Sequence, residues 1–301
     1  MSTRYFNHRV QKARQFLAQR MSGDTPEHPG LTTSFWNLLE KIKQDREAAL
    51  ALAYSLLDTS APSERFFAVV LLGKIFNPTE RHQRAEARHM IAVLAARAAR
   101  ERHPAILTQI GYALGKPYLR EAVRPLVKLS RHPHEDVRYA ATGSIVSGIH
   151  ERAPKYALDR LFELMRDPDP DVRNWATFAV GTQLDIEANN SDAIRQALLD
   201  RTRDRHFETR AEAFRGLARR GDRRGVLPLK HWLERQDQQG KTIWTWEIEA
   251  AGIYGDPIFY PALTSVAEWW RTDQPVMSWA LARCHPDMEI RDRTLLEDQL
   301  Y

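Results

Sequence analysis

The sequence lacks most of the features on which secreted proteins, membrane proteins and enzymes depend. A single cysteine, Cys284, allows no internal disulfide and no cysteine-based metal cluster, and it favours a reducing compartment such as the cytoplasm. No apolar run approaches the roughly 18 residues that cross a bilayer, and no secretory apolar region follows the first residues. No glycine-rich phosphate loop, nucleophile elbow or paired carboxylates stand out. We therefore predict a cytoplasmic protein without a cofactor or a catalytic site.

Apolar and charged residues occur in the proportions of a folded chain. Of the 301 residues, 43% are hydrophobic and 28% are charged, which is enough for a continuous core. The formal net charge of +5 is modest, so its distribution matters more than its total. This length fits either two ordinary domains or one array of repeats, and a search for repeats decides between them.

A helix-forming phrase recurs along the chain. It is clearest in DPDPDVRNWATFAVG, residues 167–181, where a proline-rich turn precedes Val172. Small or apolar residues follow four and eight positions after Val172, and a glycine follows at nine. Successive copies begin 31 to 42 residues apart, which is the spacing of one antiparallel helix pair per repeat. The copies begin at Glu64, Ile106, Val137, Val172, Thr209, Ile243 and Val276.

A second amphipathic helix lies between successive copies, for example around Ala157, Leu161 and Leu164. No alternation typical of β-strands competes with this helical periodicity. We therefore predict an all-α fold, a right-handed α-solenoid of about seven helix pairs that spans residues 31–301.

Residues 1–30 form the other predicted domain, an N-terminal helix and its linker. Five basic residues and no acidic residue precede Asp24, a composition that resembles a transit peptide. The apolar residues of this segment nevertheless share one helical face, which favours a capping helix docked on the first repeat. These residues are Phe6, Val10, Ala13 and Leu17.

The phrase DPDPDVRNWATFAVG resembles the HEAT repeat, in particular the short variety found in bilin-lyase-like bacterial proteins. The resemblance covers about residues 46–285, and it implies that the helix with Val-Arg is the inner one and lines a concave face. It also implies that a turn acid and this arginine bridge adjacent repeats. Leu107, Trp244 and Met277 replace the arginine in other copies, so we expect the ladder to be interrupted toward both ends. The implied ladder pairs are Asp136 with Arg138, Asp171 with Arg173, and Glu208 with Arg210.

A narrower resemblance concerns function. The run VRNWATFAVG, followed by SDAIRQALLDRTRD and TRAEAFRGLARRGDRRGVLPL, is similar to bacterial HEAT-repeat proteins encoded within Rhs toxin loci. This resemblance implies a protein partner, such as a cognate toxin or effector domain, and an immunity or accessory role. The likeness to bilin lyases comes from the repeats alone and identifies no catalytic group.

Helical geometry identifies the side chains that point away from the core of each inner helix. With the core at positions zero, four, seven and eight, positions two and six face outward, because each residue advances by about 100°. Aromatic residues at such positions favour a groove that binds a protein, and coverage by a flanking loop is the alternative interpretation. Trp244 joins the set because it replaces a ladder arginine. The candidate partner-binding residues are Phe66, Tyr112, Tyr139, Asn174, Phe178, Arg215, Trp244, Thr245 and Glu249.

Three further tryptophans, Trp175, Trp246 and Trp279, occupy position three, at the edge of the core. Stacking between successive repeats is the simplest explanation, and contact with a nucleic-acid base or a ligand is the alternative. His132 and His134 share a turn, but no third ligand is evident, so we predict no metal site.

Residues 195–235 concentrate positive charge, with twelve basic and six acidic residues. This segment forms either an electropositive ridge that attracts an acidic protein or a phosphate backbone, or a solvated rim whose charges pair locally. The sequence leaves both interpretations open. A nucleic-acid-binding HEAT-like protein related to the alkylpurine DNA glycosylases is therefore the alternative function.

Overall fold

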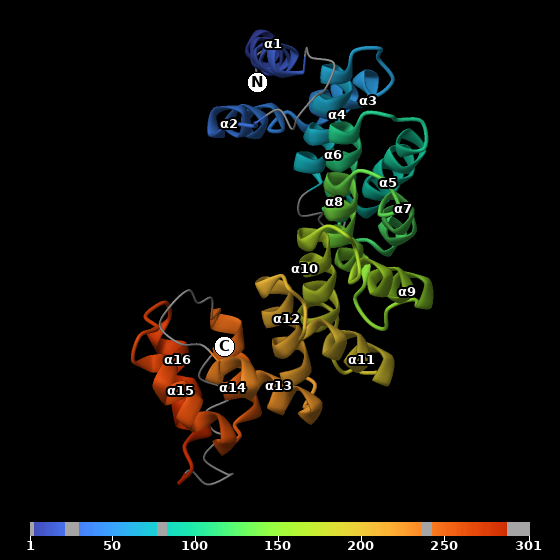
Figure 1. The fold of residues 1–301 in the computed structure, drawn as a ribbon. Coiled ribbons are helices and arrows are strands. Elements are labelled where there is room, and N and C mark those ends of the chain that lie inside the picture. The colour runs from blue at the N-terminus through green and yellow to red at the C-terminus, as the bar shows by residue number, and fades with distance from the viewer. Residues whose placement is uncertain (1–2, 22–29, 77–82, 236–242, 288–301) are drawn as a thin grey trace. The chain divides into compact units, whose positions relative to one another are not determined.

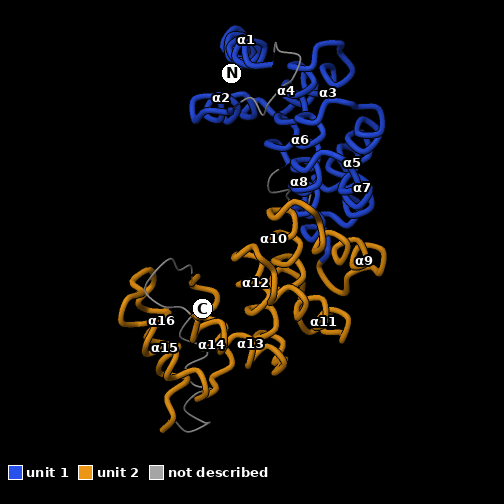
Figure 2. Tube along the Cα trace, viewed as in Figure 1, with its two compact units in different colours: residues 1–149 blue, residues 150–301 orange. Residues whose placement is uncertain are grey.

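The repeats fold into helix hairpins that stack side by side within two units (Figure 1). The computed structural model describes residues 3–21, 30–76, 83–235 and 243–287, and within these ranges the regular structure is entirely helical. Contacts divide the chain into two compact units, Met1–Ile149 and His150–Tyr301 (Figure 2). The described helices form three pairs in the first unit and four in the second, which confirms the predicted all-α fold of about seven pairs.

The first unit has two N-terminal helices followed by the pairs α3/α4, α5/α6 and α7/α8. Its α-helices are α1 (Thr3–Arg20), α2 (Thr33–Ile42), α3 (Arg46–Leu56), α4 (Pro62–Ile75), α5 (Arg84–Ala98), α6 (Pro104–Gly115), α7 (Val123–Leu129) and α8 (Glu135–Ile145). Two short 3₁₀ turns, η2 (Arg120–Ala122) and η3 (Val146–Gly148), flank the last pair.

The second unit contains the pairs α9/α10, α11/α12, α13/α14 and α15/α16. Its α-helices are α9 (Lys155–Leu164), α10 (Pro170–Phe178), α11 (Asp192–Arg201), α12 (Phe207–Ala218), α13 (Val226–Glu234), α14 (Thr245–Tyr254), α15 (Tyr260–Ala267) and α16 (Gln274–Cys284). A π-helical turn, η4 (Ala179–Gln183), continues α10. Two 3₁₀ turns, η5 (Arg223–Gly225) and η6 (Pro257–Phe259), precede α13 and α15.

Helix α1 caps the first pair, as its apolar pattern predicts. Ala13 and Leu17 are completely buried, and α1 packs against α2 and α4. An ion pair of 2.7 Å between Arg14 Nε and Glu64 Oε1 fastens α1 to α4. Helix α2 is an addition that the repeat alignment did not predict. Apart from Gly30, the predicted linker lies outside the described residues, and the boundary after residue 30 stays a prediction.

The second helices of consecutive pairs pack more extensively on one another than the first helices do, so they form the inner row of each unit. Glycines allow this close approach: a Cβ on Gly216 of α12 would lie 2.8 Å from the Cα of Gly181. Between α14 and α16, the Trp279 ring fills the space that a Cβ on Gly252 would need. Trp279 therefore stacks between successive repeats, as expected from its position.

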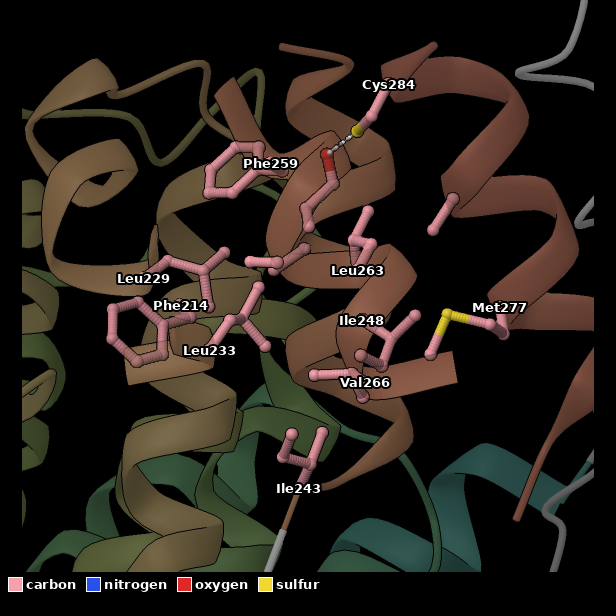
Figure 3. Packing of buried hydrophobic residues seen from close by; sticks show 14 of the residues in the cluster. Phe214, Leu229, Leu233, Ile243, Ile248, Phe259, Leu263, Val266, Met277 and Cys284 are labelled. Carbon is pink, nitrogen blue, oxygen red and sulfur yellow. Dashed lines mark hydrogen bonds between the residues drawn. The ribbon is translucent and has the colours of Figure 1, made fainter. Parts of the chain in front are cut away.

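The core of the second unit follows the same register (Figure 3). Phe214 of α12, Ile248 of α14 and Met277 of α16 meet side chains of the outer helices α13 and α15, such as Leu229 and Leu263. Cys284 ends this cluster, and its Sγ lies 3.3 Å from the carbonyl oxygen of Ala251. The cysteine thus belongs to the packing of the repeat.

Because the inner row is closely packed, replacing its glycines by alanine should affect stability to different degrees. Gly216→Ala should destabilise the protein by about 1–3 kcal/mol, because its Cβ would press on backbone that has no room to move. Gly73→Ala meets Ala113 Cβ at 3.3 Å and also gains helix propensity, so its stability should change little or rise. Thermal unfolding of the two variants measures the difference, and equal melting temperatures would contradict this packing account.

Candidate partner-binding surface

In the first unit the inner face carries two partly exposed tyrosines. Tyr112 of α6 is 37% exposed, and Tyr139 of α8 is half-buried. Burial, together with the nearby Tyr139 and Asp136, raises the pKa of Tyr112 to about 12, so its hydroxyl stays neutral. These two side chains offer aromatic surface with a polar tip, the combination that is enriched in protein interfaces.

Phe66, which the helical pattern also predicted to face outward, is completely buried. Residues 66–73 of α4 are buried on every side of the helix, because α1 and α2 pack on α4 in addition to α3 and α6. The prediction that Phe66 contacts a partner is therefore wrong. The covering helices come from outside the repeat pattern, so the pattern did not reveal them.

In the second unit the candidate polar residues join neighbouring inner helices. Asn174 Nδ2 of α10 donates to Glu208 Oε2 of α12 at 2.8 Å. Arg215 Nε of α12 lies 2.9 Å from Glu249 Oε2 of α14. Glu249 is buried, whereas Asn174 and Arg215 are partly exposed. These polar groups fix the register of the inner row, and a partner would meet them as pairs.

A third polar bridge contains a carboxyl that the sequence did not single out. Thr182 Oγ1 donates to Glu212 Oε2 at 3.2 Å, and Glu212 is only 2% exposed. Burial is the main cause that raises the pKa of Glu212 to about 7, with smaller contributions of the same sign from Glu249 and Glu208. Arg215 and the threonine oppose this shift. The inner face of this unit thus contains a carboxyl that titrates close to neutral pH.

Aromatic side chains gather where α12 and α14 begin. Phe207 stacks on Trp244 with ring centroids 5.4 Å apart, and Trp244 stacks on Trp246 at 5.1 Å. All three rings and the intervening Thr245 are half-buried. At the end of α10, Phe178 meets Trp175 edge-on at 5.6 Å and is also half-buried. We call Phe207, Trp244 and Trp246 the aromatic stack.

The ladder arginines bind the turn that precedes their own helix. Arg173 Nη1 donates to the carbonyls of Asp167 and Pro168 at 2.9 and 3.0 Å. The same bonds, five and six residues upstream, come from Arg65 and Arg138, and Arg210 makes the bond to the carbonyl six residues upstream. Arg65 is a member that the resemblance did not identify, although it occupies the arginine position of the first copy. The arginine ladder is Arg65, Arg138, Arg173 and Arg210.

The acids of the ladder differ from those that the resemblance implies. Arg173 reaches Asp204 of the next turn with two contacts of 3.1 Å, and Arg65 reaches Glu101 of the next turn at 2.9 and 3.2 Å. Arg210 lies 3.7 Å from Glu247, a completely buried carboxyl whose pKa burial raises to about 7. Asp204 and Glu101 both stand five residues before a repeat start, an offset that a search at fixed spacing would find.

The predicted acids Asp136, Asp171 and Glu208 do not bridge to their assigned arginines. They belong to the first turn of their helices, and the carboxylates of Asp136 and Asp171 are 64% and 65% exposed. Glu208 instead accepts from Asn174. The bridging acid is held in the preceding turn, since Asp204 Oδ1 accepts the N–H of His206 at 2.9 Å and is thereby aimed at Arg173. Of the three implied pairs, the arginines are right and the acids are wrong.

Many basic side chains of residues 195–235 have partners within the unit. Arg220 is buried and donates to the carbonyls of Gly181 and Val180 at 2.6 and 2.7 Å, and burial lowers its pKa to about 10. Arg224 pairs with Asp222, and Arg223 pairs with Asp256. Arg203 and Arg205 are exposed. Local pairing therefore accounts for much of this charge.

The two histidines of the α7–α8 turn have structural roles. His132 Nδ1 accepts the N–H of His134 at 3.1 Å, and His134 Nδ1 accepts the N–H of Asp136 at 3.3 Å. In the part of the chain that the structure describes, no group of three His, Cys, Asp or Glu side chains is placed to hold a metal ion. Likewise, none of the described helices has the length and apolarity needed to cross a membrane.

Comparison with known proteins identifies the repeat. Residues 91–180 match the family model described as HEAT repeats. Protein YibA of Escherichia coli (strain K12) is 35% identical over 126 residues, and Protein YibA of Escherichia coli O157:H7 gives the same values. The alignment covers 42% of this chain and 41% of YibA, so the similar segment spans less than half of these curated relatives.

Two solved structures show a similar arrangement over most of the chain. The X-ray structure of E. coli YibA has a TM-score of 0.63 at 21% identity and covers 95% of this chain and 98% of its own. The crystal structure of an engineered protein has a TM-score of 0.52 at 17% identity, with coverage of 91% and 73%. At these identities the likeness establishes the fold, an α-solenoid of HEAT-like pairs.

The assignment of the ladder acids leads to a stability prediction. Burial opposes ionisation of Asp204, but the hydrogen bonds from Arg173 and from the His206 N–H outweigh it and lower the pKa of Asp204 below 3.8. Asp204→Asn should therefore cost about 1–3 kcal/mol of unfolding free energy near neutral pH. The contribution is complete above about pH 4 and fades as the pH falls further, because the wild-type carboxyl then becomes protonated.

Asp171→Asn is the matched control, because this carboxylate is exposed and should contribute no more than about 0.5 kcal/mol. Urea unfolding of both variants at neutral and acidic pH compares them. A larger loss from Asp171→Asn than from Asp204→Asn would contradict the assignment.

The effect of Glu212 on stability has the opposite pH dependence, because the pKa of this carboxyl is raised. A carboxyl whose folded pKa exceeds its unfolded value destabilises the protein as the pH rises from 4.5 to about 7, because the folded state then has to ionise a buried group. Glu212→Gln keeps an acceptor for Thr182 and avoids this cost. Its unfolding free energy should exceed that of the wild type by roughly 2 kcal/mol at about pH 8, and the two should converge near pH 4. Melting curves at both pH values test this, with the partly exposed Glu208→Gln as the control; an equal gain at acidic pH would refute it.

Proposed function

We propose that this chain is a non-enzymatic scaffold that holds a protein partner against the inner faces of its helix pairs. The observation that carries the proposal is the set of half-exposed aromatic residues on the inner helices, Tyr112, Tyr139, Phe178 and Trp244. Large rigid rings bury much area on binding at a small cost in conformational entropy, so they are the usual anchors of interfaces. Glu212 and Glu247 have raised pKa values, but Glu212 accepts a hydrogen bond from Thr182 and Glu247 accepts one from the Trp244 N–H. These structural roles explain the two carboxyls without a catalytic function.

The identity of the partner rests on the resemblance to proteins encoded in Rhs toxin loci. On this basis the partner is a cognate toxin or effector domain, and the chain acts as its immunity or accessory protein in the cytoplasm. A solenoid suits this role, because successive pairs within a unit extend a surface along a folded partner. Asn174, Arg215, Thr245 and Glu249 would then border the aromatic anchors of the second unit.

The nucleic-acid alternative receives less support. The inner face of the second unit offers little free positive charge to a phosphate backbone, because Arg215 pairs with the buried Glu249 and Glu208 adds a partly exposed carboxylate. Much of the basic charge of residues 195–235 is paired with acids or carbonyls of the same unit. The remaining exposed arginines, such as Arg203 and Arg205, are few for a duplex-binding surface.

A double substitution tests the scaffold proposal. Tyr139→Ala with Phe178→Ala should raise the Kd for the partner by about a hundredfold, because each ring removed is expected to cost at least about 1.4 kcal/mol. Proteins encoded beside this gene are purified and titrated against the wild type and the variant by calorimetry. Both positions are partly exposed, so the variant should remain folded.

Leu227→Ala provides the control, since Leu227 is a 55% exposed apolar residue on the outer helix α13. Its Kd should equal that of the wild type. A partner that binds the double variant as tightly as the wild type would contradict the proposal. Tight binding to duplex DNA that weakens steeply with salt would instead favour the nucleic-acid alternative.

A further inference from the structure

A groove of about 500 Å³ opens on the first unit, between α2, α4 and α6. Its apolar lining comes from Leu31 and from Trp36 of α2, from Val69 and Val70 of α4, and from Ala113 of α6. Its volume lies within the range of about 300–1,000 Å³ that is typical of ligand sites. Tyr112, at its rim, is the most exposed aromatic side chain of the inner helices.

The charged residues that line this groove are basic. Among the described residues, its lining contains two lysines, Lys74 and Lys116, and no acidic side chain. The Lys74 ammonium lies 4.8 Å from the ring centroid of Trp36 and 3.0 Å from Glu40 Oε1, so it is held in place. Lys116 follows the last residue of α6, is partly exposed, and has no ion pair with any described residue. An apolar lining beside a lysine that pairs with no acid among the described residues is complementary to an apolar group next to a carboxylate.

Partly exposed tyrosines lie beside the groove, on α6 and α8. Tyr112 lies between the groove and Tyr139 of α8, and the two tyrosines are close enough for Tyr139 to raise the pKa of Tyr112. Partly exposed aromatic side chains are thus available on three elements, Trp36 on α2, Tyr112 on α6 and Tyr139 on α8. A polypeptide fits such an arrangement, because successive side chains can occupy the groove and the tyrosines together.

We propose that this groove binds a segment of the protein partner in which apolar side chains stand next to an acidic residue. The apolar side chains enter between Trp36 and Val70, and the carboxylate pairs with Lys116. The proposal rests on the scaffold function proposed above and adds to it the chemistry of the bound segment.

Selection from a phage-displayed library of short random peptides tests this proposal with the full chain as bait. The recovered peptides should combine Leu, Ile, Phe or Trp with Asp or Glu. Fluorescein-labelled copies of the best peptides should bind Lys116→Glu and Tyr112→Ala about tenfold or more weakly than the wild type. Both positions are solvent-accessible, so these variants should fold, and circular dichroism verifies this. Lys155→Glu is the charge-matched control, because Lys155 is 86% exposed on the outer helix α9 of the other unit, and it should leave the Kd unchanged.

Several outcomes would overturn the proposal. The proposal fails if the recovered peptides lack acidic residues. It also fails if the peptides bind Lys116→Glu with the same Kd as the wild type. Dodecanoate that binds in a Lys116-dependent manner, while no peptide is recovered, would assign the groove to small amphiphilic anions instead. If the native partner is lost with Tyr139→Ala and Phe178→Ala but retained with Lys116→Glu, the groove proposal fails while the scaffold proposal stands.

Discussion

The repeats that contain a ladder arginine depend on the hydrogen bonds that this arginine makes to the turn before its own helix. Where the first helix of a pair ends, backbone carbonyls are left without partners, and a guanidinium has enough donors to bind two of them. A charge so deeply placed also needs an anion, and the turn of the next pair supplies it, as Asp204 does for Arg173. The same side chain therefore closes one hairpin and attaches the following one.

The sequence predicts the inner helices well, because their burial follows from local periodicity. Val172, Ala176 and Val180 are all completely buried, as the repeat register requires. Phe66 obeys the same register, yet it is buried by helices that lie outside the repeats. A periodic pattern shows which side of a helix faces its own pair, but it does not show what packs on the opposite side.

The polar contacts of the candidate surface were harder to predict, since they depend on the register between helices that are about one repeat apart in sequence. The resemblance identified three of the four ladder arginines but assigned them acids of the first helical turn, of which Asp136 and Asp171 are exposed. The actual acids are aimed by backbone N–H groups of the turn, as in Asp204 and Glu101. Their constant offset of five residues before the repeat start is visible in the sequence, but the resemblance pointed to the acids of the first helical turn instead.

The reach of the ladder arginine also bears on how such a chain can change in length. Because the guanidinium binds carbonyls five or six residues upstream, an insertion or deletion within that interval would pull the donor away from its acceptors. The connections from one pair to the next are under no such restraint. Gain and loss of residues is therefore expected outside this interval, between pairs and in the first helix of a pair, where α5 has 15 residues and α7 has 7.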